Sequence, residues 1–215
     1  MKKHISKLCF LGALGASLLT SCTPGSSPSI GGSGKSGSFS YYPKALKANN
    51  PSNVKIKVST SARTVYVVEG DRVLLATRAG VGKAGSPTPG GNSRVGRKHA
   101  GKRRVSNPGA GYPMPYWVEF AGKPAYGFHW GFVKPQPCSM GCVRLPWHVA
   151  PQFFNLVRVG TPINVSRSQK WDSSIGSRLP VLDDGPLPNP PSSYMNSSKV
   201  FSDIKNHRVP PIYAR

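Results

Sequence analysis

Residues 54–78, with the sequence VKIKVSTSARTVYVVEGDRVLLATR, carry the pattern that decides the fold. In the first part of this stretch, apolar side chains alternate with Lys55 and Lys57, which is the period of a half-buried β-strand. Two further runs rich in β-branched residues stand on either side of Gly70 and Asp71, as in a β-hairpin. The stretch therefore predicts successive strands at the start of a β-rich domain.

The composition agrees with a β-rich domain. The 215 residues leave room for one ordinary domain with tails, and the sequence contains no internal repeat. With 24 glycines and 22 prolines, about one residue in five favours turns, which argues against a helical bundle. Hydrophobic residues make up 38% of the chain, which is enough to fill one core.

Further strands and one helix are predicted after the hairpin. Residues 113–120, 125–130 and 161–166 are plausible strands. Residues 146–160 place apolar side chains at helical spacing between an initial proline and a final glycine, which predicts a short amphipathic helix. The sequence thus predicts a mainly β fold, a sandwich or barrel-like sheet with one or two short helices.

The first 21 residues have the composition of an export signal. The basic start MKKHISK precedes the apolar run LCFLGALGASLLT, which at about thirteen residues is too short to span a bilayer. The sequence LTSC at 19–22 resembles a bacterial lipobox, so Cys22 is the predicted site of lipid attachment. A soluble secreted protein with an incidental cysteine is the alternative. The predicted location is the cell envelope, and Thr23 favours the periplasmic side of an outer membrane over the outer face of the cytoplasmic membrane.

These features divide the chain into four parts. The signal peptide covers residues 1–21, and the Ser/Gly/Pro-rich residues 22–53 are predicted to form a flexible tether. The folded domain is predicted at 54–166. Residues 167–215 are rich in serine and proline without a sustained period, so they are predicted to be an irregular tail.

The chain is strongly basic, with 29 lysines and arginines against 7 acidic residues and a formal charge of +22. The basic run from Arg94 to Arg104 is typical of nucleic-acid contacts, but export argues against that partner. Outside the cytoplasm the anionic partners are lipid headgroups, glycan-associated polymers and peptide carboxylates, all of which such a charge attracts. A face that is merely well solvated is the alternative.

Two of the four cysteines, Cys138 and Cys142, fall inside the predicted domain. Cys142 lies in the run CSMGCVRLP, and His129 ends a predicted strand upstream of it. A thiol nucleophile needs a base and backbone N–H groups that converge on the developing oxyanion. Gly141 allows the tight turn that such convergence requires, and the basic residues nearby along the chain favour ionised sulfur. Taken alone, a Cys–His pair is more often structural than catalytic.

The order of several short motifs resembles the L,D-transpeptidase catalytic domain of the YkuD type. The family signature is a histidine, then a Ser/Thr-His-Gly-Cys run followed by an apolar residue and Arg or Asn. Here the corresponding residues are FHWG at 128–131 and SMGCVRLP at 139–146. The resemblance extends over the predicted domain through TRAGVGKAGSPTPGG at 77–91, MPYWVEF at 114–120 and GTPINV at 160–165.

The resemblance implies a YkuD-like sheet and a role for each residue of the signature. Cys142 is the implied nucleophile and His129 the implied general base. The implied oxyanion hole is formed by the backbone amides of Met140, Gly141 and Cys142, and the orienting or substrate-binding residues are Trp130, Ser139 and Arg144. Within that set, the carbonyl of Trp130 orients the imidazole, while Arg144 holds the loop or binds a substrate carboxylate.

The sequence departs from the family signature at two positions. Met140 stands where the family has histidine, a change that the backbone oxyanion hole can tolerate. Trp130 stands where the family has a small residue, and its bulk is expected to narrow or reshape the groove for the acyl donor.

The implied reaction is acyl transfer between peptidoglycan peptide stems without a metal or organic cofactor. The nucleophile attacks the third residue of a tetrapeptide stem, expels D-Ala and passes the acyl group to an amine, which gives a 3→3 cross-link. With water as acceptor the same chemistry makes an L,D-carboxypeptidase, and an inactive peptidoglycan-binding module is a further alternative. Family members are also acylated by carbapenems.

Three structural alternatives concern the same cysteines and histidines. In an oxidising envelope Cys138 and Cys142 could form a disulfide that masks the nucleophile. A zinc site from these two cysteines with His129 and His148 is the rival of a different class, but the spacing between the cysteines is outside the common forms. His148 is otherwise predicted at the surface where the helix begins, and His99 is predicted to be a solvated loop residue.

Overall fold

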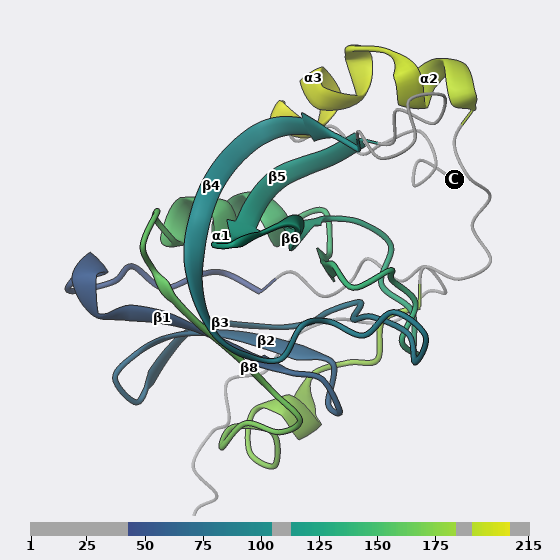
Figure 1. The fold of residues 1–215 in the computed structure, drawn as a ribbon. Helices are drawn as coiled ribbons and strands as arrows, with labels where there is room; N and C mark the ends of the chain where they lie inside the picture. Colours follow the sequence, from purple (N-terminus) through teal and green to yellow (C-terminus); the bar gives the residue numbers. More distant parts are fainter. Residues whose placement is uncertain (1–42, 105–112, 184–190, 207–215) are drawn as a thin grey trace, which may run out of the picture. The chain divides into compact units, whose positions relative to one another are not determined.

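The computed structural model describes residues 43–104, 113–183 and 191–206 (Figure 1). The predicted signal peptide, Cys22 and the tether up to residue 42 lie outside the described residues. Within the described ranges, no helix combines the length and apolar character needed to cross a membrane.

The strands of the described residues form one eight-stranded mixed sheet in the order β3-β2-β1-β8-β4-β5-β6-β7. This confirms the mainly β prediction, including the hairpin and the three later strands. The bounds of the strands are β1 Val54–Ser59, β2 Thr64–Glu69, β3 Arg72–Arg78, β4 Gly91–Arg103, β5 Pro113–Phe120, β6 Lys123–Trp130, β7 Val143–Leu145 and β8 Pro162–Ser166.

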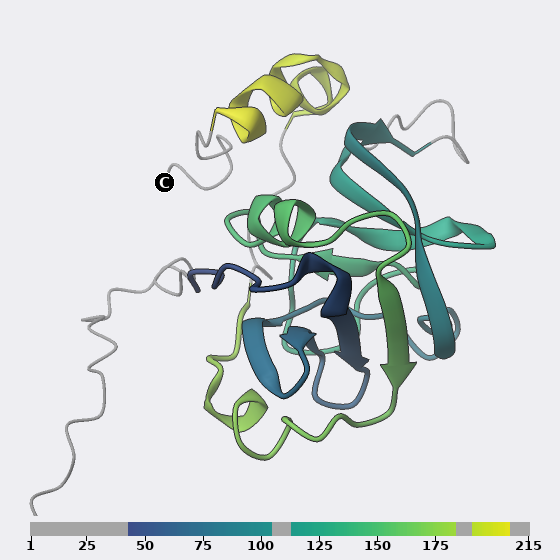
Figure 2. The ribbon, with the colours of Figure 1, turned by 90° about the vertical axis from the view of Figure 1, so that its left-hand side faces the viewer.

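The long strand β4 joins the two layers of this sheet. Its first residues, Gly91 to Arg94, pair with β8, whereas the part from Val95 onward pairs with β5. Figure 1 shows β4 curving from the layer of β1, β2, β3 and β8 to the layer of β5 and β6, and Figure 2 shows the same strand from the side. A glycine stands at this bend because a Cβ on Gly96 would lie 3.1 Å from the Cα of Ala121.

The basic run that the sequence places in a loop is therefore a strand. His99 is exposed, as predicted, but it lies in β4 opposite Trp117 of β5 rather than in a loop. Most side chains of β4 are exposed or half-buried, so polar residues can occupy it without burial cost. The apolar alternation that normally reveals a strand is absent for the same reason.

Apolar side chains from both layers meet in one hydrophobic core. Phe128 of β6 packs against Phe120 of β5 and Phe153 of helix α1 (Ala150–Leu156), with ring centroids 5.0 and 4.8 Å apart. Burying each such ring stabilises the fold by about 1.5–3 kcal/mol. The helix is shorter than predicted because Pro146 opens a turn that precedes it, and Pro151 occupies its first turn.

The residues just before β1 are hydrogen-bonded to the domain. Gln152 of α1 donates to the carbonyl of Pro43 and accepts from the amide of Ala45, each at 2.8 Å. The Leu46 amide donates to Leu74 of β3 at 2.8 Å. The 3-10 turn η1 (Pro51–Asn53) then leads into β1. The last residues of the predicted tether thus contact the sheet and α1.

The chain after β8 contains more regular structure than its sequence predicts. Asp172 accepts hydrogen bonds from the hydroxyls of Ser59 and Tyr66, and the ring of Trp171 lies 5.6 Å from that of Tyr66. The 3-10 turn η2 (Gly176–Arg178) follows, and beyond residue 190 come the short helices α2 (Ser192–Asn196) and α3 (Lys199–Lys205). The segment after β8 is thus fixed by polar contacts as well as by packing.

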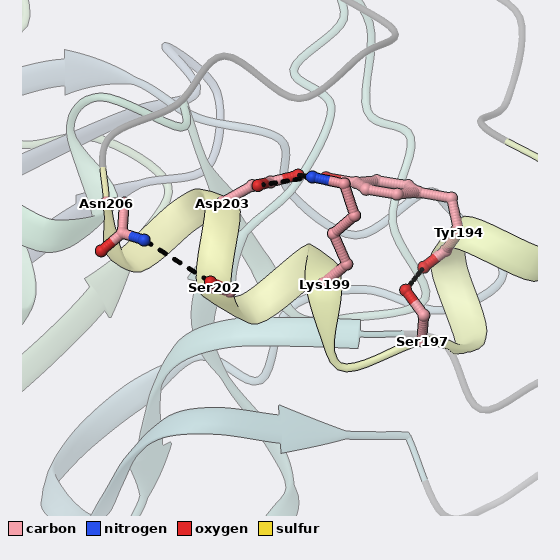
Figure 3. A network of polar contacts seen from close by, with 6 residues as sticks. All are labelled: Tyr194, Ser197, Lys199, Ser202, Asp203 and Asn206. Carbon is pink, nitrogen blue, oxygen red and sulfur yellow. Dashed lines mark hydrogen bonds and ion pairs between the residues drawn. The ribbon is translucent and has the colours of Figure 1, made fainter.

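Helices α2 and α3 are linked by the polar network shown in Figure 3. The buried carboxylate of Asp203 accepts from Lys199 at 2.9 Å and from the hydroxyl of Tyr194 at 3.1 Å. Arg103 of β4 donates to the carbonyls of Met195 and Ser197 at 2.8 and 2.7 Å. These bonds satisfy carbonyls that the short helix α2 leaves without an intrahelical partner.

Candidate active site

The parallel pairing of β6 with β7 brings the predicted catalytic histidine and cysteine together. His129 lies opposite Arg144, and Phe128 lies opposite Val143, immediately after Cys142. Residues paired across strands share a face of the sheet, so His129 and Arg144 lie on the face away from the core. Cys142 and His129 both line one cavity of about 500 Å³.

His129 is fixed by a backbone hydrogen bond and by an aromatic ring. Its side chain is only 3% exposed, its Nδ1 lies 2.5 Å from the carbonyl oxygen of Trp130, and its ring stacks on Trp117 at 6.1 Å. Because a carbonyl oxygen only accepts, Nδ1 carries the proton and Nε2 of the neutral ring is left as an acceptor. Burial lowers the pKa of His129 to about 4, and the charges of Arg144 and Lys102 act in the same direction.

Cys142 has a raised pKa in this environment. Burial raises the pKa of the thiol. A hydrogen bond from the Gly127 backbone is the largest effect that opposes this shift, followed by the charges of Arg144, Lys102 and Arg104. The sulfur lies 3.6 Å from the carbonyl oxygen of Ala125, to which the thiol donates. The basic neighbours thus favour ionised sulfur, as the sequence predicts, but desolvation outweighs them. The two groups rest as a neutral thiol and a neutral imidazole.

The loop before Cys142 is held from inside by a buried serine. The Ser139 hydroxyl donates to the carbonyl of Cys142 at 2.6 Å and accepts from the amide of Gly141 at 3.1 Å. The Ser139 backbone also bonds to Val81 and Lys83, which anchors the loop to the segment after β3. Among the described residues, the amides of Met140 and Cys142 have no backbone acceptor, so these two are the donors left for an oxyanion.

Gly141 has a conformation and surroundings that only glycine accommodates. Its φ is +106°, and a Cβ there would lie 2.5 Å from Cε1 of Tyr126. We expect Gly141→Ala to slow labelling of Cys142 by a thiol-reactive probe more than tenfold, because Tyr126 or the loop must move. Labelling rates and thermal unfolding measure the effect.

Gly160 provides a matched control for that substitution. Its φ is +85°, but nothing lies within 4 Å of a Cβ placed on it. Gly160→Ala therefore adds similar backbone strain, about 1–2 kcal/mol, without a collision. Equal labelling rates for the two variants would show that the close approach of Tyr126 to Gly141 is irrelevant to the loop.

The remaining residues of the predicted site are distributed between the cavity and the core. Met140 is 60% exposed and lines the cavity. The Trp130 side chain is 1% exposed, packs 6.1 Å from the ring of Phe132 and does not line the cavity. The expectation that Trp130 narrows the groove is therefore wrong, because strand alternation turns its ring into the core while His129 takes the other face.

Arg144 lines the cavity and is held by the backbone of its neighbours. Its amide and carbonyl pair with Gly80 at 2.8 and 2.9 Å. A Cβ on Gly131 would lie 3.0 Å from the Arg144 side chain, so that glycine permits the close approach. One guanidinium nitrogen lies 3.9 Å from the sulfur of Cys138.

Both cysteines of the domain are free thiols in this structure. Cys138 is half-buried, and its sulfur contacts Arg144 and the carbonyl of Phe132 rather than the cavity. In the described part of the chain, no group of three or more His, Cys, Asp or Glu side chains is arranged to hold a metal ion. The geometry thus offers a nucleophile and a base in one cavity, but no metal centre among these residues.

Several residues of the cavity escaped the sequence analysis, among them one from β4 and one from β5. Lys102 of β4 lines it, and the Lys102 ammonium lies 3.8 Å from the centroid of the Trp117 ring. Lys102 was part of the basic run and Trp117 part of a strand motif, so nothing local connected them. The pairing of β4 with β5 brings them together beside His129.

A second hollow, of about 590 Å³, lies over the outer faces of β1, β8 and β4. Its lining includes Lys55, Lys57, Arg94 and Lys123, but no cysteine, histidine or carboxylate. It therefore lacks the groups that acyl transfer needs.

Comparison with known proteins places the domain in a family. A family model described as YkuD, L,D-transpeptidase catalytic domain, matches residues 53–165, more than half of the chain. No curated protein matches the chain. Solved structures with a similar fold include an L,D-transpeptidase (Yku) from Stackebrandtia nassauensis, at 21% identity and a TM-score of 0.48 over 59% of this chain and 60% of that one.

Two mycobacterial structures show a similar level of likeness. L,D-transpeptidase 1 of Mycobacterium tuberculosis is 28% identical with a TM-score of 0.45, over 53% of this chain and 61% of that one. An L,D-transpeptidase from Mycobacterium smegmatis is 26% identical with a TM-score of 0.47, over 53% and 58%. The chain thus spans about 60% of the length of each of these structures.

Proposed function

The chain belongs to the YkuD family of L,D-transpeptidase catalytic domains, and from that premise we propose that it transfers acyl groups between peptidoglycan peptide stems. The observation that carries the proposal is the shared cavity of Cys142 and His129, whose Nδ1 is held by the Trp130 carbonyl. The donor is a tetrapeptide stem and the leaving group is its terminal D-Ala. The acceptor is an amine of a second stem, which gives a 3→3 cross-link.

In the proposed first step, the sulfur of Cys142 attacks the carbonyl carbon of the third stem residue. His129 Nε2 takes the thiol proton as the carbon–sulfur bond forms, and later gives it to the departing amine of D-Ala. The thioester is then attacked by the acceptor amine, whose proton returns to the thiolate through the same imidazole. A general base with its other nitrogen tied to a carbonyl is already in the tautomer that this step needs.

The developing oxyanion is proposed to lie against the amides of Met140 and Cys142. The sequence assigned this role to the amides of Met140, Gly141 and Cys142, but the Gly141 amide already donates to Ser139. Ser139 thereby acts as a positioning residue that holds the turn in shape. Arg144 lines the same cavity and is proposed to bind a substrate carboxylate.

Incubation of the purified protein with tetrapeptide-bearing muropeptides, followed by mass spectrometry, tests this function. Cross-linked dimers with release of D-Ala are the expected products. Tripeptides without dimers would identify an L,D-carboxypeptidase of the same mechanism instead. Unchanged substrate, together with cell-wall binding and no carbapenem adduct on Cys142, would identify an inactive binding module.

The pH dependence of the reaction follows from the lowered pKa of His129. The imidazole acts as base only when unprotonated, and burial lowers its pKa from 6.5 to about 4. We therefore expect kcat/KM to be level from about pH 5 to neutrality and to fall about tenfold per pH unit below about 4. A kcat/KM profile from pH 3 to 8 measures this, and an acid limb near 6.5 would contradict the buried neutral base.

The cell envelope is the proposed location, and peptide stems are the proposed partners, because peptidoglycan lies there. Attachment through a lipid on Cys22 is proposed from the sequence alone, as is attraction to anionic envelope polymers. Mass spectrometry of the mature protein tests the lipid attachment. A diacylated N-terminal Cys22 is the expected result, and an unmodified residue at that position would exclude it.

A further inference from the structure

The outer face of the sheet carries a hollow that the proposed reaction does not use. This hollow, of about 590 Å³, lies where β8 runs between β1 and β4 (Figure 1), and it shares no lining residue with the cavity of Cys142 and His129. Its volume is in the range of known ligand sites. A ligand held there is bound apart from the reacting groups.

Strand alternation places cations and amides on the floor of the hollow. Lys57 of β1 lies opposite Asn164 of β8, and Asn164 lies opposite Asn92 of β4, so these three residues form one row across the strands. Lys55 and Arg94 stand two positions along β1 and β4 from that row and share its face. Because neighbouring strands lie about 4.8 Å apart, the floor spreads its cations over about 10 Å.

The cations of the hollow have no anionic partner among the described residues. Its lining contains no carboxylate, and its four cations take part in none of the ion pairs of the described chain; they are Lys55, Lys57, Arg94 and Lys123. Arg94 donates through one guanidinium nitrogen to the carbonyl of Gly160 at 3.2 Å, which leaves its other N–H groups for a ligand. Four cations without a counter-charge attract a ligand that carries several negative charges.

A chain of side-chain amides ends at the hollow with a hydrogen-bond donor. Gln169 Nε2 donates to the backbone carbonyl of Val58 at 3.0 Å, which fixes the orientation of the amide because a carbonyl oxygen only accepts. The same nitrogen donates to Oδ1 of Asn164 at 2.9 Å, and Nδ2 of Asn164 donates to Oδ1 of Asn92 at 2.8 Å. The Nδ2 group of Asn92 is thus left in the lining as a donor with no acceptor in the described part of the chain.

The donors of the hollow suit phosphate better than carboxylate. Three of the four cations are lysines, whose ammonium groups act as point charges and can meet an oxygen from any direction. Planar carboxylates are matched by the fork of an arginine, and this lining contains one arginine. Because the donors come from β1, β4 and β6, they surround the hollow on several sides, as the tetrahedral oxygens of a phosphate group require.

We propose that this hollow binds a polyanionic chain whose repeating units carry phosphodiester groups. The four cations neutralise successive phosphates, and the Asn92 amide donates to a phosphate oxygen. A chain is the ligand because cations spread over about 10 Å need more than one anionic group. The site goes beyond the proposed function, because acyl transfer uses none of these residues. It would hold the protein on a phosphate-bearing polymer of the envelope.

Calorimetric titration of the full chain with poly(glycerol phosphate) tests the site, with polygalacturonate and dextran of similar length as comparisons. We expect poly(glycerol phosphate) to bind about tenfold more tightly than polygalacturonate, the value of one hydrogen bond to a charged group, and dextran not to bind. Binding should weaken about 10- to 30-fold between about 50 and 200 mM salt, as for three phosphate contacts. Equal Kd values for the two charged polymers, or no binding of the phosphate polymer, would overturn the proposal.

Asn92→Asp assigns the binding to the hollow. The substitution replaces the Nδ2 donor with a carboxylate oxygen of similar shape and keeps an acceptor for Asn164. Since Asn92 is exposed, the fold should be unchanged, which thermal unfolding checks. The Kd for poly(glycerol phosphate) should rise about 10- to 100-fold, through the lost hydrogen bond and the repulsion between like charges.

Lys44→Gln is the matched control for the change in net charge. It also makes the chain one charge less positive, at an exposed position that lines neither this hollow nor the cavity of Cys142. We expect it to raise the Kd less than about threefold, since a distant surface charge is largely screened. Equal losses in the two variants would show that net charge, and not the hollow, binds the polymer.

Activity assays separate this site from the proposed function. Polymer binding needs no turnover, so the Kd values test the hollow even if the protein releases no D-Ala. If the protein is active, Asn92→Asp should release D-Ala from a soluble tetrapeptide within about threefold of the parent rate, because such a surface change costs little elsewhere. Loss of that activity together with polymer binding would show a general structural effect and would overturn the assignment.

Vesicles of phosphatidylglycerol distinguish a membrane surface from the polymer. A flat bilayer meets the rim of the hollow rather than the amide on its floor, so we expect Asn92→Asp and Lys44→Gln to bind these vesicles equally well. If Asn92→Asp lost vesicle binding as strongly as polymer binding, the hollow would be a site for lipid headgroups and the proposed ligand would be wrong.

Discussion

Cys142→Ala is expected to lower D-Ala release and cross-link formation at least about a thousandfold, to the level of a reaction without enzyme. The thioester requires the sulfur, and no other thiol in the described residues lines the cavity. Because Cys142 is half-buried and its sulfur makes only weak contacts with the backbone of Ala125 and Gly127, the substitution should leave the fold intact. Muropeptide mass spectrometry and thermal unfolding measure the two effects.

Cys138→Ala is the matched control for this prediction. It removes the second thiol of the same loop, but one that contacts Arg144 and the Phe132 carbonyl instead of lining the cavity. We expect it to retain turnover within about threefold of the parent, since small changes at such a position cost little. If Cys138→Ala were inactive and Cys142→Ala active, the nucleophile would be Cys138.

His129→Gln is expected to lower kcat/KM at pH 7 by about 10²- to 10⁴-fold, the range for loss of a general base. The pKa of Cys142 is raised by burial, so without the imidazole the thiol stays protonated at neutral pH. Glutamine can still donate to the Trp130 carbonyl, which limits damage to the end of β6.

The pH profile distinguishes a lost base from a damaged fold. Hydroxide can deprotonate the thiol when the imidazole cannot, so the rate of His129→Gln should rise with pH toward the raised pKa of Cys142. The parent protein should show a level profile over the same range. A variant that stays inactive up to pH 10 while unfolding at the parent temperature would contradict the role of His129 as base.

The strand β1 was predictable because its apolar residues alternate with lysines. β2, β3 and β5 do not alternate, but their runs of β-branched, aromatic and other apolar residues are enough to reveal buried strands. β4 was not predictable in this way. Most of its side chains are exposed or half-buried, so polar and basic residues occupy it and no apolar period marks it as a strand. The short strand β7 was missed because three residues carry too little period.

The sequence by itself determined the strand-rich fold, the Cys142 and His129 candidates and the glycine turn between Ser139 and Cys142, because these depend on local patterns and residue chemistry. The tertiary structure alone decided that Trp130 faces the core and that Lys102 and Trp117 meet in the cavity. It also decided that desolvation raises the pKa of the Cys142 thiol by more than the basic neighbours lower it. Burial depends on which distant strands pair, and no local pattern in the chain records that pairing.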